Sequence, residues 1–207
     1  MARSLSKGEA TREAILDAAI ALAREVGLAS LTIGALAERV GMSKSGLFAH
    51  FGAKEELQLA VLRAAQARFD EQVLRPALTH PRGLKRLRAM YHGWLDWTMR
   101  QERPGGCVIL AAASEFDDRP GPVRDFLASQ TETWLTGLGR MARLAVEAGE
   151  LPADTDIEQF AFEWLGLILS VHHHHGLLDD QRFYPMAWRG LERLIAAPPR
   201  LTAASPG

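Results

Sequence analysis

Helical periodicity runs along most of the chain, and this feature limits the fold more than any other. In the first segment the apolar residues Ile15, Ala19, Leu22 and Val26 recur at intervals of four, three and four, which places them on one face of a helix. No stretch shows the alternation of apolar and polar residues that is typical of a β-strand. Glycine and proline clusters separate the helical segments. The sequence therefore predicts an all-α protein.

The first fifty residues predict three helices, of which the second and third are short. Thr32 and Ser43 stand where an N-cap is needed, and Gly41 and Gly52 follow the last residues of the two short helices. The turn Gly41-Met42 joins them, as in a DNA-reading helix-turn-helix whose second helix enters the major groove. Residues 1–53 are therefore predicted to form a three-helix DNA-binding domain.

Residues 54–207 are predicted to form a second, larger helical domain. A long helix is expected from Lys54 to Leu74, with Pro76 and Pro81 closing it. The tail at 198–207 is rich in proline, alanine and serine and is expected to be disordered. This domain is the expected place for ligand binding and dimerisation.

Composition indicates a globular protein that works in the cytoplasm. Of the 207 residues, 47% are hydrophobic and 24% are charged, which is ordinary for a packed domain. The longest uncharged apolar stretch, Trp164 to Val171, is too short to span a bilayer, so no membrane association is expected. A single cysteine, Cys107, rules out an intrachain disulfide. Residues 1–54 hold seven basic and five acidic side chains, so the small basic excess lies at the predicted DNA-binding end.

The specific signal is the run from Thr32 to Leu57, TIGALAERVGMSKSGLFAHFGAKEEL. This run resembles the signature of the TetR family of transcriptional regulators. The resemblance implies a homodimer that binds double-stranded operator DNA at a near-palindromic site, acts most often as a repressor, and is released by a small-molecule effector. Phe48 departs from the family's usual tyrosine, which removes a hydroxyl that could donate to phosphate.

The predicted DNA contacts lie on the second and third helices and at the start of the fourth. Lys44 is the best candidate for a guanine contact. Lys54 opposes the dipole of its own helix, and a DNA phosphate would compensate for this. Thr32 either caps its helix only or also touches phosphate, and His50 is either a DNA contact or a solvated side chain. The full predicted set is Thr32, Ser43, Lys44, Ser45, Gly46, Leu47, Phe48, His50 and Lys54.

The remaining helices supply candidates for dimerisation and for effector binding. The helices predicted at 157–178 and 183–195 are the expected dimer surface, because the first is apolar nearly all round; burial within one subunit is the alternative. An apolar or aromatic effector is expected, bound by large or polarizable side chains that could equally be core. These candidates are Trp94, Trp97, Cys107, Phe116, Trp134 and Trp164.

Four consecutive histidines, His172 to His175, are the most unusual feature of the chain. Successive helical residues point about 100° apart, so only His172 and His175 could chelate a metal from one face. Histidines at a helix end, where their charge suits the dipole, are the more ordinary interpretation, and no cofactor or metal is expected.

Two other functions stay open alongside the effector-responsive regulator. One is a metal-responsive regulator that uses His172 and His175, and the other is a helical protein-interaction module. An enzyme is not expected, because neither G-x-S-x-G, G-x-x-x-x-G-K-[ST] nor H-E-x-x-H occurs.

Overall fold

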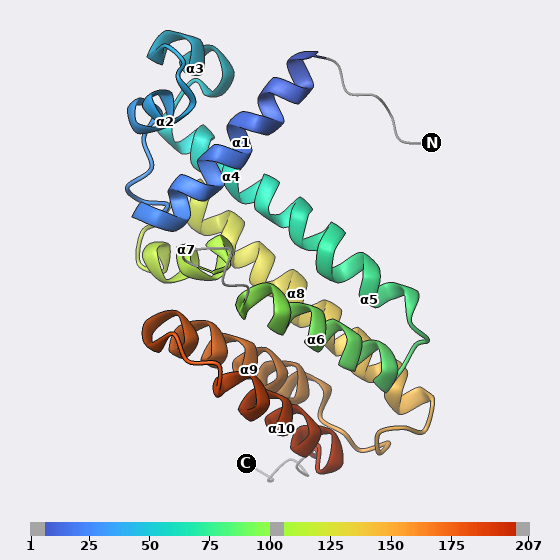
Figure 1. The fold of residues 1–207 in the computed structure, drawn as a ribbon. Helices are drawn as coiled ribbons and strands as arrows, with labels where there is room; N and C mark the ends of the chain where they lie inside the picture. The colour runs from blue at the N-terminus through green and yellow to red at the C-terminus, as the bar shows by residue number, and fades with distance from the viewer. Residues whose placement is uncertain (1–6, 100–105, 202–207) are drawn as a thin grey trace. The chain divides into compact units, whose positions relative to one another are not determined.

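The computed structural model describes residues 7–99 and 106–201, and within these ranges the secondary structure is helical (Figure 1). An isolated β-bridge joins Thr155 to Arg200, and no strand occurs in the described ranges. This confirms the predicted all-α fold. The helices are α1 (Lys7–Val26), α2 (Ile33–Val40), α3 (Lys44–Phe51), α4 (Lys54–Phe69), the π-helical segment η1 (Asp70–Leu74), α5 (Arg75–Thr79), α6 (Leu84–Met99), α7 (Val108–Phe116), α8 (Pro122–Glu147), α9 (Ile157–Leu178) and α10 (Phe183–Ala196).

The helices form two compact units, and neither unit is one continuous piece of chain. Unit 1 comprises the described residues within 1–68 and 101–128. Unit 2 comprises those within 69–100 and 129–207. Unit 1 thus holds the predicted helix-turn-helix together with most of α4, all of α7 and the first residues of α8. The domain boundary after residue 53 stays a prediction.

The short helices of unit 1 begin and end at the predicted residues. Thr32 Oγ1 accepts a hydrogen bond from the Ala35 amide at 3.1 Å, and Ser43 Oγ accepts one from the Gly46 amide at 3.1 Å. Gly41 ends α2 with a φ of 68°, in the left-handed region that favours glycine. These local signals can be predicted because each cap involves side-chain and backbone atoms only a few residues apart.

The predicted long helix does not run to Leu74 as a regular α-helix. The chain widens into the π-helical segment at Asp70–Leu74 and then continues through Pro76 in the first turn of α5. Pro76 has no amide hydrogen, so the α-helical hydrogen bond that this residue would make is missing. The amide of Arg75 instead donates to the carbonyl of Asp70, five residues back.

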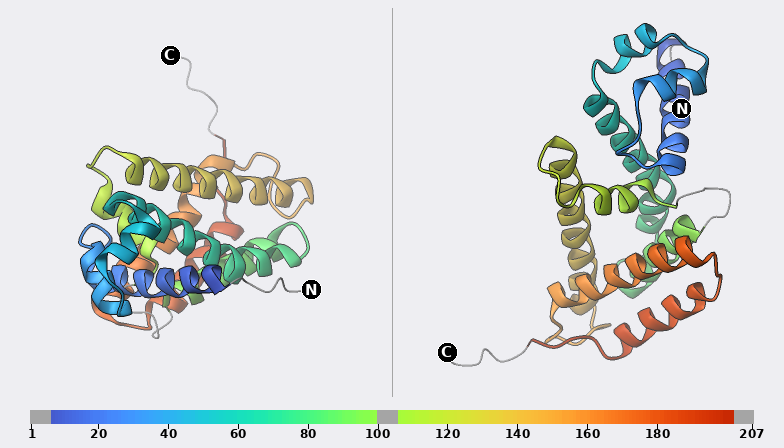
Figure 2. Two further views of the ribbon diagram at one scale, coloured as in Figure 1. Left: turned by 90° about the horizontal axis from the view of Figure 1, so that it is seen from above. Right: turned by 90° about the vertical axis from the view of Figure 1, so that its left-hand side faces the viewer.

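Unit 2 is built around α6, α9 and α10. Helices α9 and α10 lie side by side in Figure 1 and in the right-hand view of Figure 2, and they pack closely. A Cβ on Gly190 of α10 would lie only 2.7 Å from Leu167 Cδ2 of α9, so the crossing needs a residue without a side chain. The Tyr91 hydroxyl of α6 donates to the carbonyl of Ala187 in α10 at 3.0 Å. Arg88 and Glu192 join the same two helices through a bidentate ion pair.

The C-terminal tail is more ordered than expected from residue 198. Pro198 is buried, the carbonyl of Pro199 accepts from the Asp156 amide at 2.8 Å, and the Leu201 amide donates to the Asp154 carbonyl at 2.9 Å. Arg200 forms an ion pair with the side chain of Asp154. The segment 198–201 thus ties to the turn before α9, and 202–207 lie outside the described residues.

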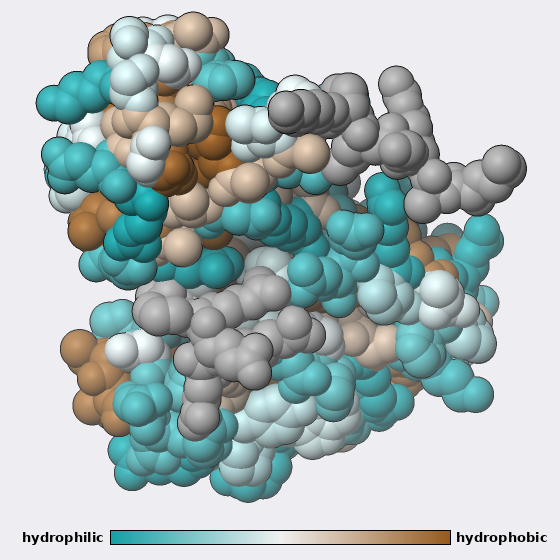
Figure 3. All heavy atoms as spheres, turned by 45° about the horizontal axis from the view of Figure 1, so that its top comes forward, coloured by the Kyte–Doolittle hydropathy of each residue, from teal (hydrophilic) through white to brown (hydrophobic). Residues whose placement is uncertain are grey.

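Apolar side chains reach the surface only in scattered places on the face drawn in Figure 3, where hydrophobic patches lie among hydrophilic side chains. In the ranges that the structure describes, no helix has the length and hydropathy needed to cross a membrane.

Candidate DNA-binding and ligand-binding sites

The helix-turn-helix of unit 1 has a buried support and an exposed reading surface. Leu36 and Leu47 are fully buried between the helices, and Phe51 closes the same core. Lys44 and His50 of α3 are exposed. Leu47 must therefore be removed from the predicted DNA contacts, because its side chain points into the core and holds α3 in place. Ser43, Ser45, Phe48 and His50 remain on the exposed side of the helix.

Lys44 and Thr32 converge at the start of α2. A Cβ built on Gly34 would lie 3.3 Å from Lys44 Cε, 3.6 Å from Lys44 Nζ and 3.9 Å from Thr32 Oγ1. The ammonium group and the hydroxyl therefore lie together at the first turn of α2. Helix N-termini favour anions, and an ammonium group adds to this preference. Such a patch can bind a phosphate, and the guanine contact of Lys44 stays a prediction.

Gly46 leaves room for the side chain that caps α3. A Cβ at this position would lie 3.2 Å from Ser43 Oγ, the atom that caps α3. A larger residue would therefore crowd the cap. The capping hydroxyl also lies 3.1 Å from Ser45 Oγ, so the start of α3 is held by a small polar network.

Lys54 has a partner within the protein. Its Nζ donates to the carbonyl of Ala29 at 2.6 Å, in the loop between α1 and α2. Gln58, one turn further along α4, is buried and donates to the Leu28 carbonyl at 2.8 Å. The cation that opposes its helix dipole is thus compensated by a backbone carbonyl, and its predicted phosphate contact stays a prediction.

Glu115 of α7 holds the same loop from the other side. Its two carboxylate oxygens accept hydrogen bonds from the amides of Leu28 at 3.1 Å and Ala29 at 2.7 Å. We call the set formed by Glu115, Lys54, Gln58 and the loop residues Leu28 and Ala29 the loop clamp. The role of Glu115 could not be predicted, because this residue lies more than eighty residues from the loop and no local pattern connects the two.

The predicted ligand-binding residues divide between the two units. Cys107 and Phe116 are buried in unit 1, at the two ends of α7. Four tryptophans, Trp94, Trp97, Trp134 and Trp164, are buried in unit 2. The sequence could not assign these residues to the two units, because a pattern that predicts burial does not show in which hydrophobic core a side chain lies.

The aromatic cluster of unit 2 is centred on Trp94. Its ring centroid lies 4.8 Å from Phe69, 4.9 Å from Trp134 and 5.7 Å from Trp164. Phe69 also contacts Trp97, at 6.0 Å. Tyr91 packs edge-on against Trp164 at 5.0 Å, and burial raises the pKa of its hydroxyl well above the ordinary value. We call Phe69, Tyr91, Trp94, Trp97, Trp134 and Trp164 the aromatic cluster.

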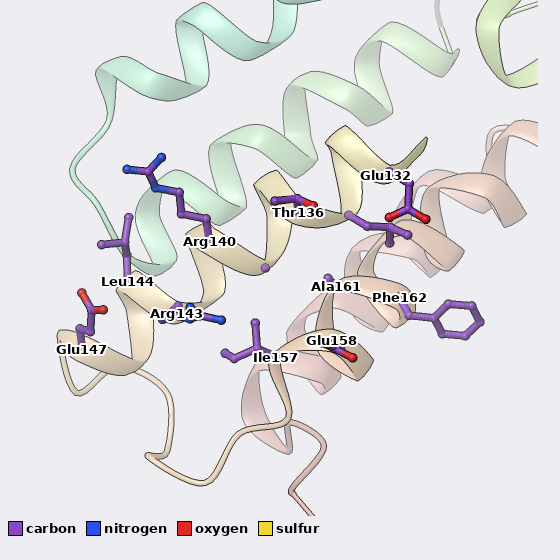
Figure 4. A pocket seen from close by; sticks show the side chains of 12 residues that line it. Glu132, Thr136, Arg140, Arg143, Leu144, Glu147, Ile157, Glu158, Ala161 and Phe162 are labelled. Atoms are coloured by element: carbon purple, nitrogen blue, oxygen red, sulfur yellow. The ribbon is translucent and has the colours of Figure 1, made fainter. Parts of the chain in front are cut away.

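A separate open groove of about 790 Å³ lies between α8 and α9 (Figure 4). Its apolar side chains include Leu144, Ile157, Ala161 and Phe162. Side chains of both charges lie around it: Glu132, Arg140, Arg143, Glu147 and Glu158. None of the predicted ligand-binding residues lines this groove. The groove could not be predicted, because in the sequence these mixed charges are typical of the solvent-exposed face of a helix.

The histidine run occupies the last turns of α9, where the sequence placed it. His174 Nδ1 lies 2.7 Å from the Ser170 carbonyl, and its ring packs 5.4 Å from Phe183. The pKa of His172 is lowered, mainly by burial and to a smaller extent by the neighbouring His173. Within 7–99 and 106–201, no three or more His, Cys, Asp or Glu side chains are grouped so that they could hold a metal ion.

The His172 environment predicts a loss of stability in mild acid. The unfolded chain takes up a proton near pH 6.5, whereas the folded protein resists protonation of His172 until a lower pH. The free energy of unfolding should therefore fall as the pH is lowered through about 6.5. We expect urea titrations at several pH values to show a weaker decline for His172→Gln. The exposed His80→Gln should leave the decline unchanged, and an equal effect of both variants would contradict the assignment to His172.

A short capped reading helix on a buried support, in a wholly helical chain, defines a helix-turn-helix DNA-binding protein. Two family models match: "Bacterial regulatory proteins, tetR family" over residues 15–61, and "Tetracyclin repressor-like, C-terminal domain" over residues 83–191, more than half of the chain. The chain belongs to the TetR family of transcriptional regulators. Members of this family bind DNA and are not enzymes.

Individual relatives support the same assignment along nearly the whole chain. The HTH-type transcriptional regulator SrpR of Pseudomonas putida is 26% identical over 96% of this chain and 91% of its own length. A TetR regulator structure from Chloroflexus aurantiacus has a TM-score of 0.85 at 24% identity, covering 96% of this chain and all of that one. The structure of AibR in complex with isovaleryl coenzyme A and operator DNA has a TM-score of 0.68 at 26% identity. The match covers 85% of this chain and 95% of the AibR chain.

Proposed function

We propose that this regulator is a dimeric repressor that binds a near-palindromic operator and is released by a small-molecule effector. The observation that carries the proposal is the α2–α3 reading surface, in which Lys44, Ser45 and His50 are exposed on a helix fixed by buried Leu47. The operator complexes reported for AibR and for CifR, a regulator of similar fold, support DNA binding by this arrangement.

The DNA-contacting residues in this proposal are Thr32, Ser43, Lys44, Ser45, Gly46, Phe48, His50 and Lys54. Thr32 and Lys44 hold a phosphate at the start of α2, which fixes the register of α3 in the major groove. Ser45 and His50 lie further along the exposed side of α3 and are the candidates for base edges.

The dimer forms through α9 and α10. Phe162, Leu169 and Leu177 recur on α9 at intervals of seven and eight residues, which places them along one side of the helix, and they are 65%, 44% and 71% exposed. Met186 adds a half-exposed apolar side chain from α10. Exposed apolar side chains on two packed helices favour association with a second copy of the same chain. The dimer would then present two reading helices to half-sites about 34–36 Å apart.

Effector release is the third part of the proposal. AibR is reported with both an acyl coenzyme A and operator DNA, which shows that a protein with this fold takes a small molecule as well as DNA. An effector that binds better to a conformation with the wrong spacing of reading helices would lower operator affinity. The protein-interaction module and the metal-responsive regulator are the alternatives.

The experiment that tests the proposal is selection of genomic DNA fragments by the purified protein at moderate salt. We expect one near-palindromic sequence to be enriched. Lys44→Ala should weaken binding to this sequence and reduce the slope of log K against log salt by about 0.9 for each lost phosphate contact. Lys85→Ala, which removes an exposed lysine from α6 in unit 2, is the matched control and should leave both quantities unchanged.

The outcomes separate the candidate functions. Enrichment of a near-palindrome by the wild-type protein supports a dimeric regulator, and relaxed selectivity at one base pair with Lys44→Ala would favour the guanine contact instead of the phosphate. Sequence-independent binding, or no binding in the ligand-free protein and after addition of Zn²⁺, would favour the protein-interaction module.

A further inference from the structure

Three buried hydrogen-bond donors of α6 and α9 lie in unit 2 without a protein acceptor. Nε1 of Trp94, Nε1 of Trp164 and Oγ1 of Thr98 make no hydrogen bond within the described part of the chain. The side chains of Trp94 and Trp164 are fully buried, and Thr98 is 3% exposed. Native cores leave few such donors unpaired, because a buried polar group without a partner destabilises the fold.

The surroundings of the two indoles define what could pair with them. Trp94 and Trp164 lie 5.7 Å apart, with Phe69, Trp134 and Tyr91 packed around them. The one phenolic hydroxyl in the cluster is already used, because Tyr91 donates to Ala187. The aromatic cluster therefore offers donors and aromatic faces, and none of its members carries a charge.

The chain next to this cluster has an irregular backbone. The π-helical segment Asp70–Leu74 starts directly after Phe69, and α6 packs on it where Gly93 faces Val73. A Cβ on Gly93 would lie 3.4 Å from Val73 Cγ1, so the two backbones approach closely there. Single π-helical turns occur frequently at functional sites. A ligand that enters between Phe69 and Trp94 would have to displace Phe69, which is joined directly to this segment.

We propose that the effector is an uncharged, planar apolar molecule that carries a hydrogen-bond acceptor such as a ketone oxygen. It binds inside the aromatic cluster, stacks between Phe69 and the two indoles, and accepts from Nε1 of Trp94 or Trp164. An anionic or cationic effector is disfavoured, because the cluster provides no charge to replace lost hydration. This inference rests on the proposed effector-responsive function and names the chemical class of the effector.

The test compares ketones with carbon isosteres of the same shape. The full-length protein, labelled with ¹⁵N, contains five tryptophans and therefore shows five indole signals at most. Acetophenone and 2-acetylnaphthalene are titrated beside α-methylstyrene and 2-isopropenylnaphthalene, in which a CH₂ group replaces the oxygen, and benzoate is the charged comparison. We expect at least one ketone to move the Trp94 or Trp164 signal downfield and to bind about five- to tenfold more tightly than its isostere.

Conservative variants assign the effect to the indole donors. Trp94→Phe and Trp164→Phe keep an aromatic ring but remove the donor, and at least one should abolish the preference for ketone over isostere. Trp188→Phe is the matched control, because Trp188 is only half-buried and packs on Tyr91 at 6.0 Å, and it should keep the full preference.

Three results would overturn the proposal: tighter binding of benzoate, equal binding of ketone and isostere, or indole signals that stay fixed up to the solubility limit of every probe. Fixed signals would mean that internal water serves these donors. None of these results bears on operator selection, which is measured without any probe. A protein that selects an operator but fails here remains a regulator with an effector of another class.

Discussion

Glu115→Ala should unfold the loop clamp and cost about 3 kcal/mol in the free energy of unfolding, since two partly buried hydrogen bonds to a charged group are lost and each such bond contributes roughly 1.5–3 kcal/mol. The variant leaves the amides of Leu28 and Ala29 without acceptors, in the loop that leads into α2. Urea titration followed by circular dichroism measures the loss. Operator affinity should fall as well, because Thr32 and the start of α2 depend on the conformation of this loop.

Two further variants show whether the carboxylate itself is responsible. Glu115→Gln keeps one oxygen acceptor but no charge, so it should lose roughly half as much stability as the alanine variant. Asp117→Ala removes a negative charge just after α7, at a side chain that is exposed and outside the clamp, and should change stability by less than about 0.5 kcal/mol. If Asp117→Ala were as harmful as Glu115→Ala, the effect would come from the charge of α7 and not from the clamp.

The clamp also shows why Gly27 is needed before the loop. Gly27 has a φ of 83°, and a Cβ at this position would lie 3.1 Å from a carboxylate oxygen of Glu115. Any other residue would be strained by the backbone conformation and would also crowd the carboxylate. Sequence alone could not indicate the second reason, because Glu115 comes from a distant helix.

Features that depend on neighbouring residues could be predicted from the sequence, whereas features that depend on distant residues could not. The caps at Thr32 and Ser43, and the bounds of α9, depend on residues within one or two turns, and all were predictable. The π-helical segment was not, because Pro76 reads as a helix stop unless the chain beyond it can pack as another helix. The internal partner of Lys54 was also missed, since a backbone carbonyl 25 residues away leaves no trace in a local pattern.

The same distinction applies to the candidate sites. The helix-turn-helix could be predicted because it is a short continuous motif, whereas its DNA contacts stay predictions. Leu47, which was counted among these contacts, is fully buried. The aromatic candidates for effector binding are buried, as the core alternative expects, and their assembly depends on which helices meet. Trp94 and Trp164 come together from α6 and α9, while Cys107 and Phe116 belong to unit 1.

Leu169→Lys should convert the regulator into a monomer and reduce operator affinity by at least about 100-fold. In a two-fold interface the same patch faces its own copy, so each substitution brings two ammonium groups into an apolar contact. A monomer then loses the gain that a linked second half-site provides. Sedimentation velocity at micromolar concentration measures the state of association, and titration of the selected operator measures the affinity.

Leu78→Lys is a closely matched control for this prediction. Leu78 of α5 and Leu169 of α9 are both leucines of unit 2, and both are 44% exposed. The two variants therefore add the same charge at equally exposed leucines and differ in the helix face they occupy. We expect Leu78→Lys to remain dimeric and to bind the operator as the wild type does. If the Leu169→Lys variant remained dimeric, the exposed side of α9 that carries Phe162, Leu169 and Leu177 would not be the interface. If both variants dissociated, the effect would not be specific to this side of α9.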